Sequence, residues 1–158
     1  MKLYIDMDAT LVDFAAQVTK LGLWRKNKPD KAAWDKVIKI GPSFWSEMEW
    51  MPGAEDAFNE LRSLSEKGVH DLYILSAVNF PQGVEGKKLW VKTRANFPLE
   101  KTIIVPKAED KAAYADGGSI LVDNNKETAD LFEASGGHSI LFTGDWSEVL
   151  WKILTTFF

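Results

Sequence analysis

Two acids separated by one residue follow an apolar run near the start of the chain. Asp6 and Asp8 come directly after Leu3-Tyr4-Ile5. Placing two carboxylates together beside a buried strand is costly unless a cation neutralises them. Mg²⁺ is a suitable cation, because it prefers oxygen ligands. Two acids in this spacing also occur in ordinary solvated turns, so other parts of the chain have to decide between a metal site and a turn.

Further polar residues follow four other apolar runs. They are Ser76-Ala77 after residues 72–75, Lys107 and Lys111 after 102–105, Asp123-Asn124 after 120–122, and Thr143-Gly144-Asp145 after 139–142. Each has an ordinary explanation alone, such as a capping hydroxyl, a solvated lysine or a turn. Their joint occurrence after successive apolar runs favours one chemical site with a nucleophile, a second acid, a hydroxyl, an ammonium group and a third carboxylate.

The apolar runs alternate with segments of helical spacing. Strands are predicted over 1–6, 72–75, 102–105, 120–122 and 139–142, and helices over 14–23, 31–40, 54–68, 87–96, 127–134 and from 146 onward. Short, almost entirely apolar strands between helices are typical of a parallel sheet covered on both faces. We therefore expect an α/β fold with a Rossmann-like three-layer core and a parallel five-stranded sheet. Ligands of such sheets bind beyond the carboxyl ends of the strands, where all the polar residues above would meet.

Residues 13–50 contain no obvious strand and many aromatic side chains. We expect a small helical cap over 13–50, inserted into a catalytic core made of 1–12 and 51–158. Phe14, Phe44, Trp45 and Trp50 are candidate walls for a stacked base, although they suit the cap's own core equally well. A basic stretch with Arg25, Lys26 and Lys28 favours a solvated loop over a phosphate-binding one.

Composition excludes several classes of function. The chain has 158 residues, a formal net charge of −4, no cysteine and two histidines, so disulfides, thiolate catalysis and a histidine-rich metal site are excluded or disfavoured. The negative charge disfavours a nucleic-acid polymer as partner. No apolar run is long enough to cross a membrane, and no signal-peptide pattern opens the chain, so a cytoplasmic location is expected. A homodimer is compatible with these features.

The ordered set Asp6-x-Asp8-x-Thr10, Ser76, Lys111 and Asp123 resembles the haloacid dehalogenase (HAD) superfamily. Within that superfamily the chain resembles the 5′(3′)-deoxyribonucleotidase family most. The resemblance extends over nearly the whole chain and includes these further stretches: Phe44-Trp45, Met51-Pro52-Gly53-Ala54, Lys88-Leu89-Trp90-Val91, Ile120-Leu121-Val122 and Gly136-Gly137.

The resemblance implies a Mg²⁺-dependent phosphomonoester hydrolase. Asp6 would attack phosphorus to form an aspartyl-phosphate, and Asp8, oriented by Thr10, would be the general acid and base. Asp6, the backbone carbonyl of Asp8 and Asp123 would hold the metal. Ser76, Ala77 and Lys111 would hold the phosphate, with Lys107 as the competing ammonium group.

The implied substrate is a nucleoside monophosphate. A sugar phosphate, or a catalytically silent phosphate-binding role, is the alternative. The chain departs from the family at Asn124, where many relatives have a second acid, and at Ala9, where glycine is frequent. A phospho-acceptor signalling module would gather similar groups, but it would need a lysine after the fifth strand, where Thr143-Gly144 stands.

Overall fold

The computed structural model describes residues 1–23 and 29–157. The basic residues Arg25, Lys26 and Lys28 lie outside the described residues. Among the described helices, none is long and apolar enough to span a membrane. The cytoplasmic location and the homodimer remain predictions.

Five parallel strands form a single sheet in the order β3-β2-β1-β4-β5. They are β1 (Lys2–Ile5), β2 (Asp71–Ala77), β3 (Thr102–Val105), β4 (Ser119–Asp123) and β5 (His138–Leu141). The predicted α/β fold with a parallel five-stranded sheet is confirmed. The chain builds outward from β1 to β3, then crosses to the other side of β1 and adds β4 and β5. The loops after β1 and β4 therefore diverge, which is the position where such sheets bind ligands.

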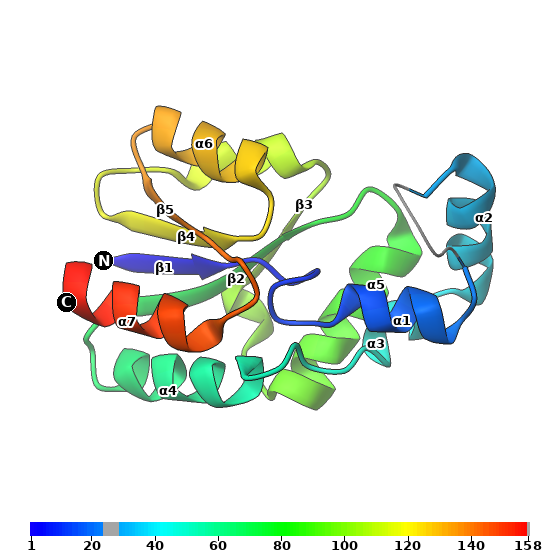
Figure 1. The fold of residues 1–158 in the computed structure, drawn as a ribbon, viewed down its shortest axis with the longest axis horizontal. Coiled ribbons are helices and arrows are strands. Elements are labelled where there is room, and N and C mark those ends of the chain that lie inside the picture. Colours follow the sequence, from blue (N-terminus) through cyan, green and yellow to red (C-terminus); the bar gives the residue numbers. More distant parts are fainter. Residues whose placement is uncertain (24–28, 158) are drawn as a thin grey trace.

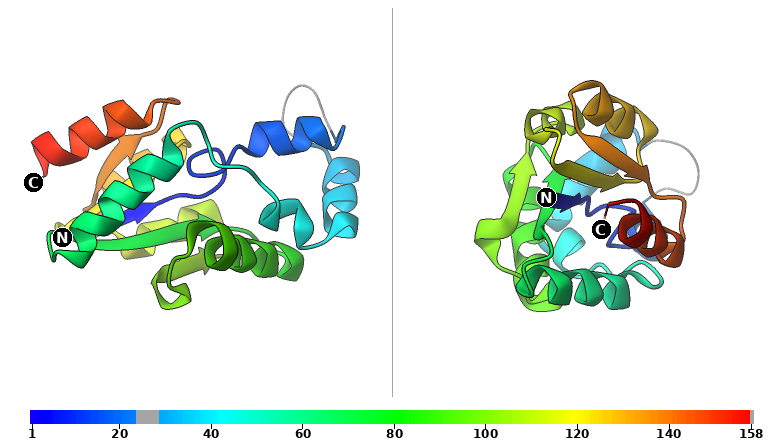
Figure 2. Two further views of the ribbon diagram at one scale, coloured as in Figure 1. Left: turned by 90° about the horizontal axis from the view of Figure 1, so that it is seen from below. Right: turned by 90° about the vertical axis from the view of Figure 1, so that its left-hand side faces the viewer.

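Helices cover both faces of the sheet (Figures 1 and 2). The α-helices are α1 (Phe14–Lys20), α2 (Lys31–Ile40), α3 (Ser43–Ser46), α4 (Ala54–Glu66), α5 (Pro81–Trp90), α6 (Lys126–Ala134) and α7 (Trp146–Thr156), and 3-10 helices occupy η2 (Leu99–Lys101) and η3 (Ala108–Tyr114). Helices α4 and α7 lie on one face, and α6 and η3 lie on the other. Alternate side chains of β1 divide accordingly: Leu3 and Ile5 join the larger core cluster, and Tyr4 joins the smaller one.

Helices α1, α2 and α3 lie beyond the carboxyl end of β1 (Figure 1). The two chain segments that lead to and from them run side by side. Val12 and Trp50 form an antiparallel bridge, and the Met51 N–H donates to the Leu11 carbonyl at 2.7 Å. This arrangement places helices above the edge of the sheet where the polar residues lie. The division into a core and a cap at these positions remains a prediction.

The helix expected over 87–96 begins six residues earlier than predicted. Helix α5 starts at Pro81, a favourable residue for a first helical turn, and continues into a π-helical turn, η1 (Val91–Ala95). The sequence predicts a loop over residues 79–86, but Gly83 and Gly86 lie within α5. In the structure they are packing positions, because a Cβ at Gly86 would overlap the Pro42 carbonyl oxygen and the Trp45 side chain. The absence of a side chain lets α5 approach α3 closely.

Replacing Gly86 with alanine is expected to destabilise the protein. The added methyl group has to displace backbone at Pro42, and overpacking of this kind costs about 1–3 kcal/mol. Gly117→Ala is the matched control, because a Cβ there meets no atom within 4 Å. Urea unfolding of both variants measures the difference. Equal unfolding midpoints would contradict the close approach of α5 to Pro42.

Candidate functional site

A tight loop after β1 positions the first two acids. The Met7 carbonyl accepts hydrogen bonds from the N–H groups of Thr10, Leu11 and Val12 at 3.2, 2.9 and 3.0 Å. Met7 itself is buried. Ala9 has a φ of 57°, the left-handed region that costs a residue with a Cβ about 1–2 kcal/mol. Glycine, frequent here in the resembling family, would avoid that cost.

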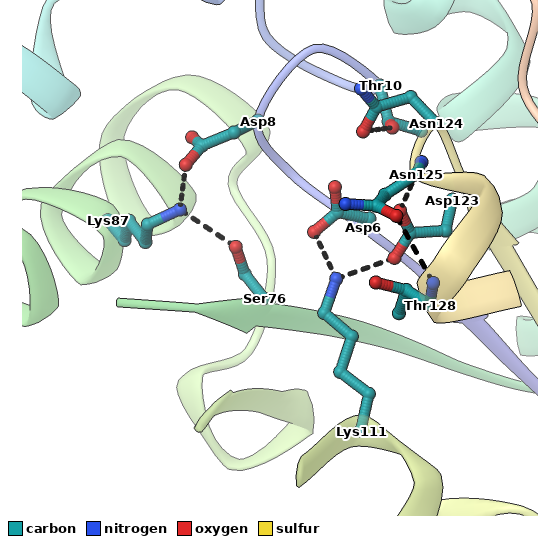
Figure 3. Close-up of polar contacts among 10 residues, drawn as sticks. All are labelled: Asp6, Asp8, Thr10, Ser76, Lys87, Lys111, Asp123, Asn124, Asn125 and Thr128. Carbon is teal, nitrogen blue, oxygen red and sulfur yellow. Dashed lines mark hydrogen bonds and ion pairs between the residues drawn. The ribbon is translucent and has the colours of Figure 1, made fainter. Parts of the chain in front are cut away.

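One cluster joins the ends of β1 and β4 (Figure 3). The Lys111 ammonium donates to Asp6 Oδ1 and to Asp123 Oδ2, both at 2.7 Å. All three side chains are at least 91% buried, with exposed fractions of 4%, 9% and 1% for Lys111, Asp6 and Asp123. Acids that are far apart in the sequence therefore meet at one ammonium group, and their role as metal ligands remains a prediction.

Burial and mutual repulsion control the charge of this cluster. Burial, followed by the neighbouring Asp6 carboxylate, raises the pKa of Asp123 to about 6. Burial alone would lower the pKa of Lys111, but Asp6 and Asp123 outweigh it and the pKa is raised. Lys111 is therefore a stable cation, whereas the carboxyl group of Asp123 loses its proton less readily than an ordinary aspartate. A site of this kind favours an additional cation.

A second cluster lies beside the first and contains Asp8 (Figure 3). The Lys87 ammonium donates to Asp8 Oδ2 at 2.7 Å and to Ser76 Oγ at 2.8 Å. Lys87 is completely buried, whereas 30% of the Asp8 side chain is exposed. Burial, only partly offset by Lys87, raises the pKa of Asp8 above its ordinary value. The two acids of the loop thus have different lysine partners.

Lys87 is a site residue that the sequence interpretation missed. It was placed at the start of a helix, where lysine is usually solvated. The true start at Pro81 places it in the buried face of α5, with Gly83, Gly86 and Trp90. A lysine within an otherwise small or apolar helical stripe is the signal that could have revealed it.

The remaining predicted residues lie around these clusters. The Thr10 hydroxyl donates to Asn124 Oδ1 at 3.5 Å, a long hydrogen bond, and the Thr10 carbonyl accepts from the Trp146 indole N–H at 3.0 Å. The Asn125 N–H donates to Asp123 Oδ1 at 2.8 Å, and Asn125 caps α6 by accepting from the Thr128 N–H at 3.2 Å. This turn holds Asp123 in place. Asn124, exposed to solvent, lines the same cavity as the acids.

The structure distinguishes the two candidate lysines. Lys111 projects from η3 into the acid cluster, whereas Lys107 is 68% exposed and lies 3.9 Å from Glu109. Lys107 is the residue before η3, and its backbone N–H donates to Asp110 Oδ2 at 3.0 Å. Its position indicates a surface residue at the start of that helix.

Two neighbouring cavities meet at Asp8 and Ala77. The polar one, about 280 Å³, is lined by both acids of the loop together with Lys111, Asp123 and the start of α6. The more apolar one, about 460 Å³, has walls from Trp34, Trp45 and Phe80. Asp8 and Ala77 line both. A molecule with a charged group in the polar cavity could extend its organic part into the aromatic one.

The predicted aromatic residues divide between wall and core. Phe14 lines the polar cavity and Trp45 the aromatic one, although Trp45 is only 1% exposed. Phe44 is completely buried and packs edge-on against Phe14 and Trp45, with ring centroids 5.7 and 4.9 Å apart. Phe44 therefore supports the two wall residues from behind. Trp34 and Phe80, which were not predicted, complete the aromatic wall.

The donor set is compatible with Mg²⁺. Among the described residues, no three acidic or histidine side chains are grouped as a metal site. Mg²⁺ usually takes only one or two carboxylates and completes its octahedron with waters and phosphate oxygens. Asp6 and Asp123 meet that requirement. The two clusters place three acidic side chains against two ammonium groups, so the site would carry one net negative charge with all five groups ionised.

Solved structures of haloacid dehalogenase-like proteins share this architecture. A haloacid dehalogenase-like hydrolase from Xanthomonas campestris has a TM-score of 0.63 and 10% identity, over 98% of this chain and 90% of that one. A HAD enzyme from Bacteroides thetaiotaomicron, solved with magnesium and inorganic phosphate, has a TM-score of 0.52 and 14% identity, over 94% and 98%. The chain has the haloacid dehalogenase-like fold, and the superfamily resemblance seen in the sequence is confirmed at the level of the fold.

One curated protein is similar to this chain in sequence. The chain is 35% identical over 104 residues to a protein of Vibrio phage KVP40 named "Putative 5'(3')-deoxyribonucleotidase". The match covers 65% of this chain and 55% of the relative, so it spans about half of the relative's length. No protein-family model matches the chain.

Proposed function

We propose that the protein is a Mg²⁺-dependent phosphomonoester hydrolase that dephosphorylates nucleoside monophosphates, deoxyribonucleotides among them. The observation that carries this proposal is the meeting of Asp6 and Asp123 at the Lys111 ammonium, inside a cavity that Asp8 also lines. A nucleophilic carboxylate, a second acid and a buried cation are what transfer of a phosphoryl group to the protein requires.

The proposed reaction uses both acids of the loop after β1. Asp6 attacks phosphorus, the ester P–O bond breaks, and Asp8 gives its proton to the departing alkoxide. Asp8 then takes a proton from a water molecule, which attacks the aspartyl-phosphate and releases inorganic phosphate and the Asp6 carboxylate. Lys111 neutralises charge on the phosphoryl oxygens, as Ser76 would through its hydroxyl. Thr10 remains a candidate for orienting Asp8 through the loop.

Asp6, Asp123 and the backbone carbonyl of Asp8 are the proposed metal ligands. When bound, Mg²⁺ would offset the net negative charge of the clusters and polarise a phosphoryl oxygen. The raised pKa of Asp123 supports this proposal, because a divalent cation would relieve the repulsion from Asp6 that contributes to it.

The aromatic cavity supports a nucleotide over a sugar phosphate. A planar base buries its faces against rings, and the rings of Trp34 and Trp45 lie 5.7 and 5.8 Å from that of Phe80. A sugar phosphate would leave these apolar walls uncovered. The name of the phage relative agrees with this choice. Trp45, Phe14 and Ala77 are the predicted binding residues that line the two cavities.

Phosphate release from a panel of substrates tests the proposed function. Nucleoside and deoxynucleoside monophosphates, with the phosphate at 5′ or 3′, are compared with hexose and pentose phosphates, with Mg²⁺ and with EDTA. We expect turnover of the nucleotides in Mg²⁺ only. Preference for sugar phosphates would support the alternative substrate, and absence of release from every ester would indicate a silent phosphate-binding protein.

A phosphoryl mimic is expected to stabilise the protein in the presence of Mg²⁺. Beryllofluoride on Asp6 would imitate the aspartyl-phosphate and contact Lys111, so Mg²⁺ and beryllofluoride together should raise the Tm more than either alone. A ligand present at about 100 times its Kd stabilises the folded state by about 2.7 kcal/mol. Thermal unfolding measures the shift, and Asp6→Asn, which cannot form the adduct, is the control. No shift would count against the phosphoryl site.

A further inference from the structure

Trp146, the first residue of α7, donates a hydrogen bond to the loop after β1. Its indole N–H lies 3.0 Å from the Thr10 carbonyl oxygen, and both residues are buried. A buried carbonyl group that loses its partner costs the full desolvation penalty, so this bond stabilises the loop in its present position. The loop that carries Asp6 and Asp8 is therefore bonded to a helix that begins 136 residues after Thr10.

The loop is otherwise held by itself and by the chain segment beside it. The Met7 carbonyl accepts from N–H groups within the loop, and the Leu11 carbonyl accepts from the Met51 N–H. Thr10 instead contacts two other elements, because its carbonyl accepts from α7 and its hydroxyl donates to Asn124 after β4, at 3.5 Å (Figure 3). The bond from Trp146 is the shorter of the two, so it is the firmer attachment of Thr10.

The indole ring of Trp146 is itself fixed by its surroundings. Asp145 caps α7 by accepting from the N–H groups of the next two helical residues, at 2.8 and 3.4 Å. The ring packs against Phe142, with centroids 5.3 Å apart, and Trp146 Cβ lies beside Gly53, where an added Cβ would be 3.6 Å away. A donor held in this way gives the loop a rigid point of attachment.

We propose that Trp146 is a positioning residue, which holds the loop after β1 through the Thr10 carbonyl and so keeps Asp6 aligned for attack on phosphorus. This inference rests on the proposed function, because it takes Asp6 as the nucleophile. Ala9, in the same loop, has a left-handed φ of 57°, and a strained loop keeps its shape only when the surrounding structure holds it. A displacement of about 1 Å at a reacting group can cost about 10²-fold in rate.

Two tryptophans with equivalent hydrogen bonds provide the test. Trp146→Phe keeps an aromatic ring but removes the N–H, and we expect it to lower kcat for a nucleoside 5′-monophosphate by about 10–10²-fold. The KM should change little, since Trp146 is not among the described residues that line either cavity. Trp90→Phe is the matched control, because Trp90 is also buried and donates to a backbone carbonyl, that of Met48, at 2.9 Å. The control should keep its kcat.

A second measurement does not depend on activity. Hydrogen exchange of the Thr10, Leu11 and Val12 amides, which bond to the Met7 carbonyl, should be faster in Trp146→Phe than in Trp90→Phe if the indole bond holds the loop. If Trp146→Phe does not fold, benzothienylalanine at position 146 replaces it, since this residue has the shape of tryptophan with sulfur in place of the N–H.

The outcomes separate the inference from the proposed function. A decrease in kcat that is specific to position 146, together with faster exchange in the loop, supports the inference. Equal kcat for the two variants, an effect confined to KM, or unchanged exchange of the loop amides would overturn it. Absence of turnover by the wild-type protein on every ester would instead overturn the proposed function, and the exchange measurement would still report whether Trp146 holds the loop.

Discussion

Asp6→Asn is expected to abolish phosphate release while leaving the fold intact. The amide cannot attack phosphorus, and loss of a nucleophile lowers kcat by at least about 10³-fold. The fold should survive, because asparagine has the same shape and its carbonyl can still accept from Lys111, which keeps its ion pair with Asp123 at 2.7 Å. Steady-state phosphate release and circular dichroism measure the two expectations.

Asp116→Asn is a matched control for Asp6→Asn. Asp116 is an exposed aspartate whose ion pair with Lys2, at 3.0 Å, lies at the opposite end of β1. The control should keep full activity, since exposed ion pairs contribute little to stability. If clean Asp6→Asn protein kept more than a few percent of the wild-type rate, Asp6 would not be the nucleophile.

Lys111→Met is expected to reduce both activity and stability. Methionine has a similar length but leaves Asp6 and Asp123 buried without their shared cation. Breaking a buried ion pair costs about 3–5 kcal/mol, an upper value here because Asp123 can take up a proton. Loss of the cation beside the phosphoryl group should lower kcat/KM by about 10²–10³-fold. Urea unfolding without Mg²⁺ and phosphate release with Mg²⁺ measure the two effects.

Lys107→Met is the control for Lys111→Met. Lys107 is exposed at the start of η3, so its replacement should change neither property measurably. The reverse result, with Lys107 essential and Lys111 dispensable, would assign the phosphate-binding role to the competing lysine and contradict the arrangement of the acid cluster.

The stability deficit of Lys111→Met should also depend on pH. A carboxyl group whose pKa is raised on folding contributes stability at low pH, and that stability is lost as the pH rises through the folded-state value. For Asp123 the window runs from its ordinary value of 3.8 to about 6. Removing Lys111 takes away a charge that lowers this pKa, so the window widens. The Tm of the variant should therefore fall further below that of the wild type at pH 8 than at pH 5. An equal decrease at both pH values would indicate that the carboxyl groups of the variant are not buried.

Residues at the ends of apolar runs were predictable from the sequence. In a parallel sheet every strand ends at the same edge, so Asp6, Ser76 and Asp123 could be assigned to one site without coordinates. Helix boundaries were less predictable. The glycines in α5 suggested a loop, because the sequence alone cannot distinguish a glycine needed for a turn from one needed for close packing against Pro42.

The sequence by itself determined the fold class and the candidate acids of the site. Hydrophobic periodicity and the alternation of strands and helices along the chain are local, repetitive patterns, so they can be seen without coordinates. Only the tertiary structure decided which charge pairs with which. Asp6 and Asp8 are two residues apart, yet one binds Lys111, 105 residues away, and the other binds Lys87, 79 residues away. Such pairings depend on how helices pack above the sheet, and the burial that makes a lysine functional exists only after that packing has formed.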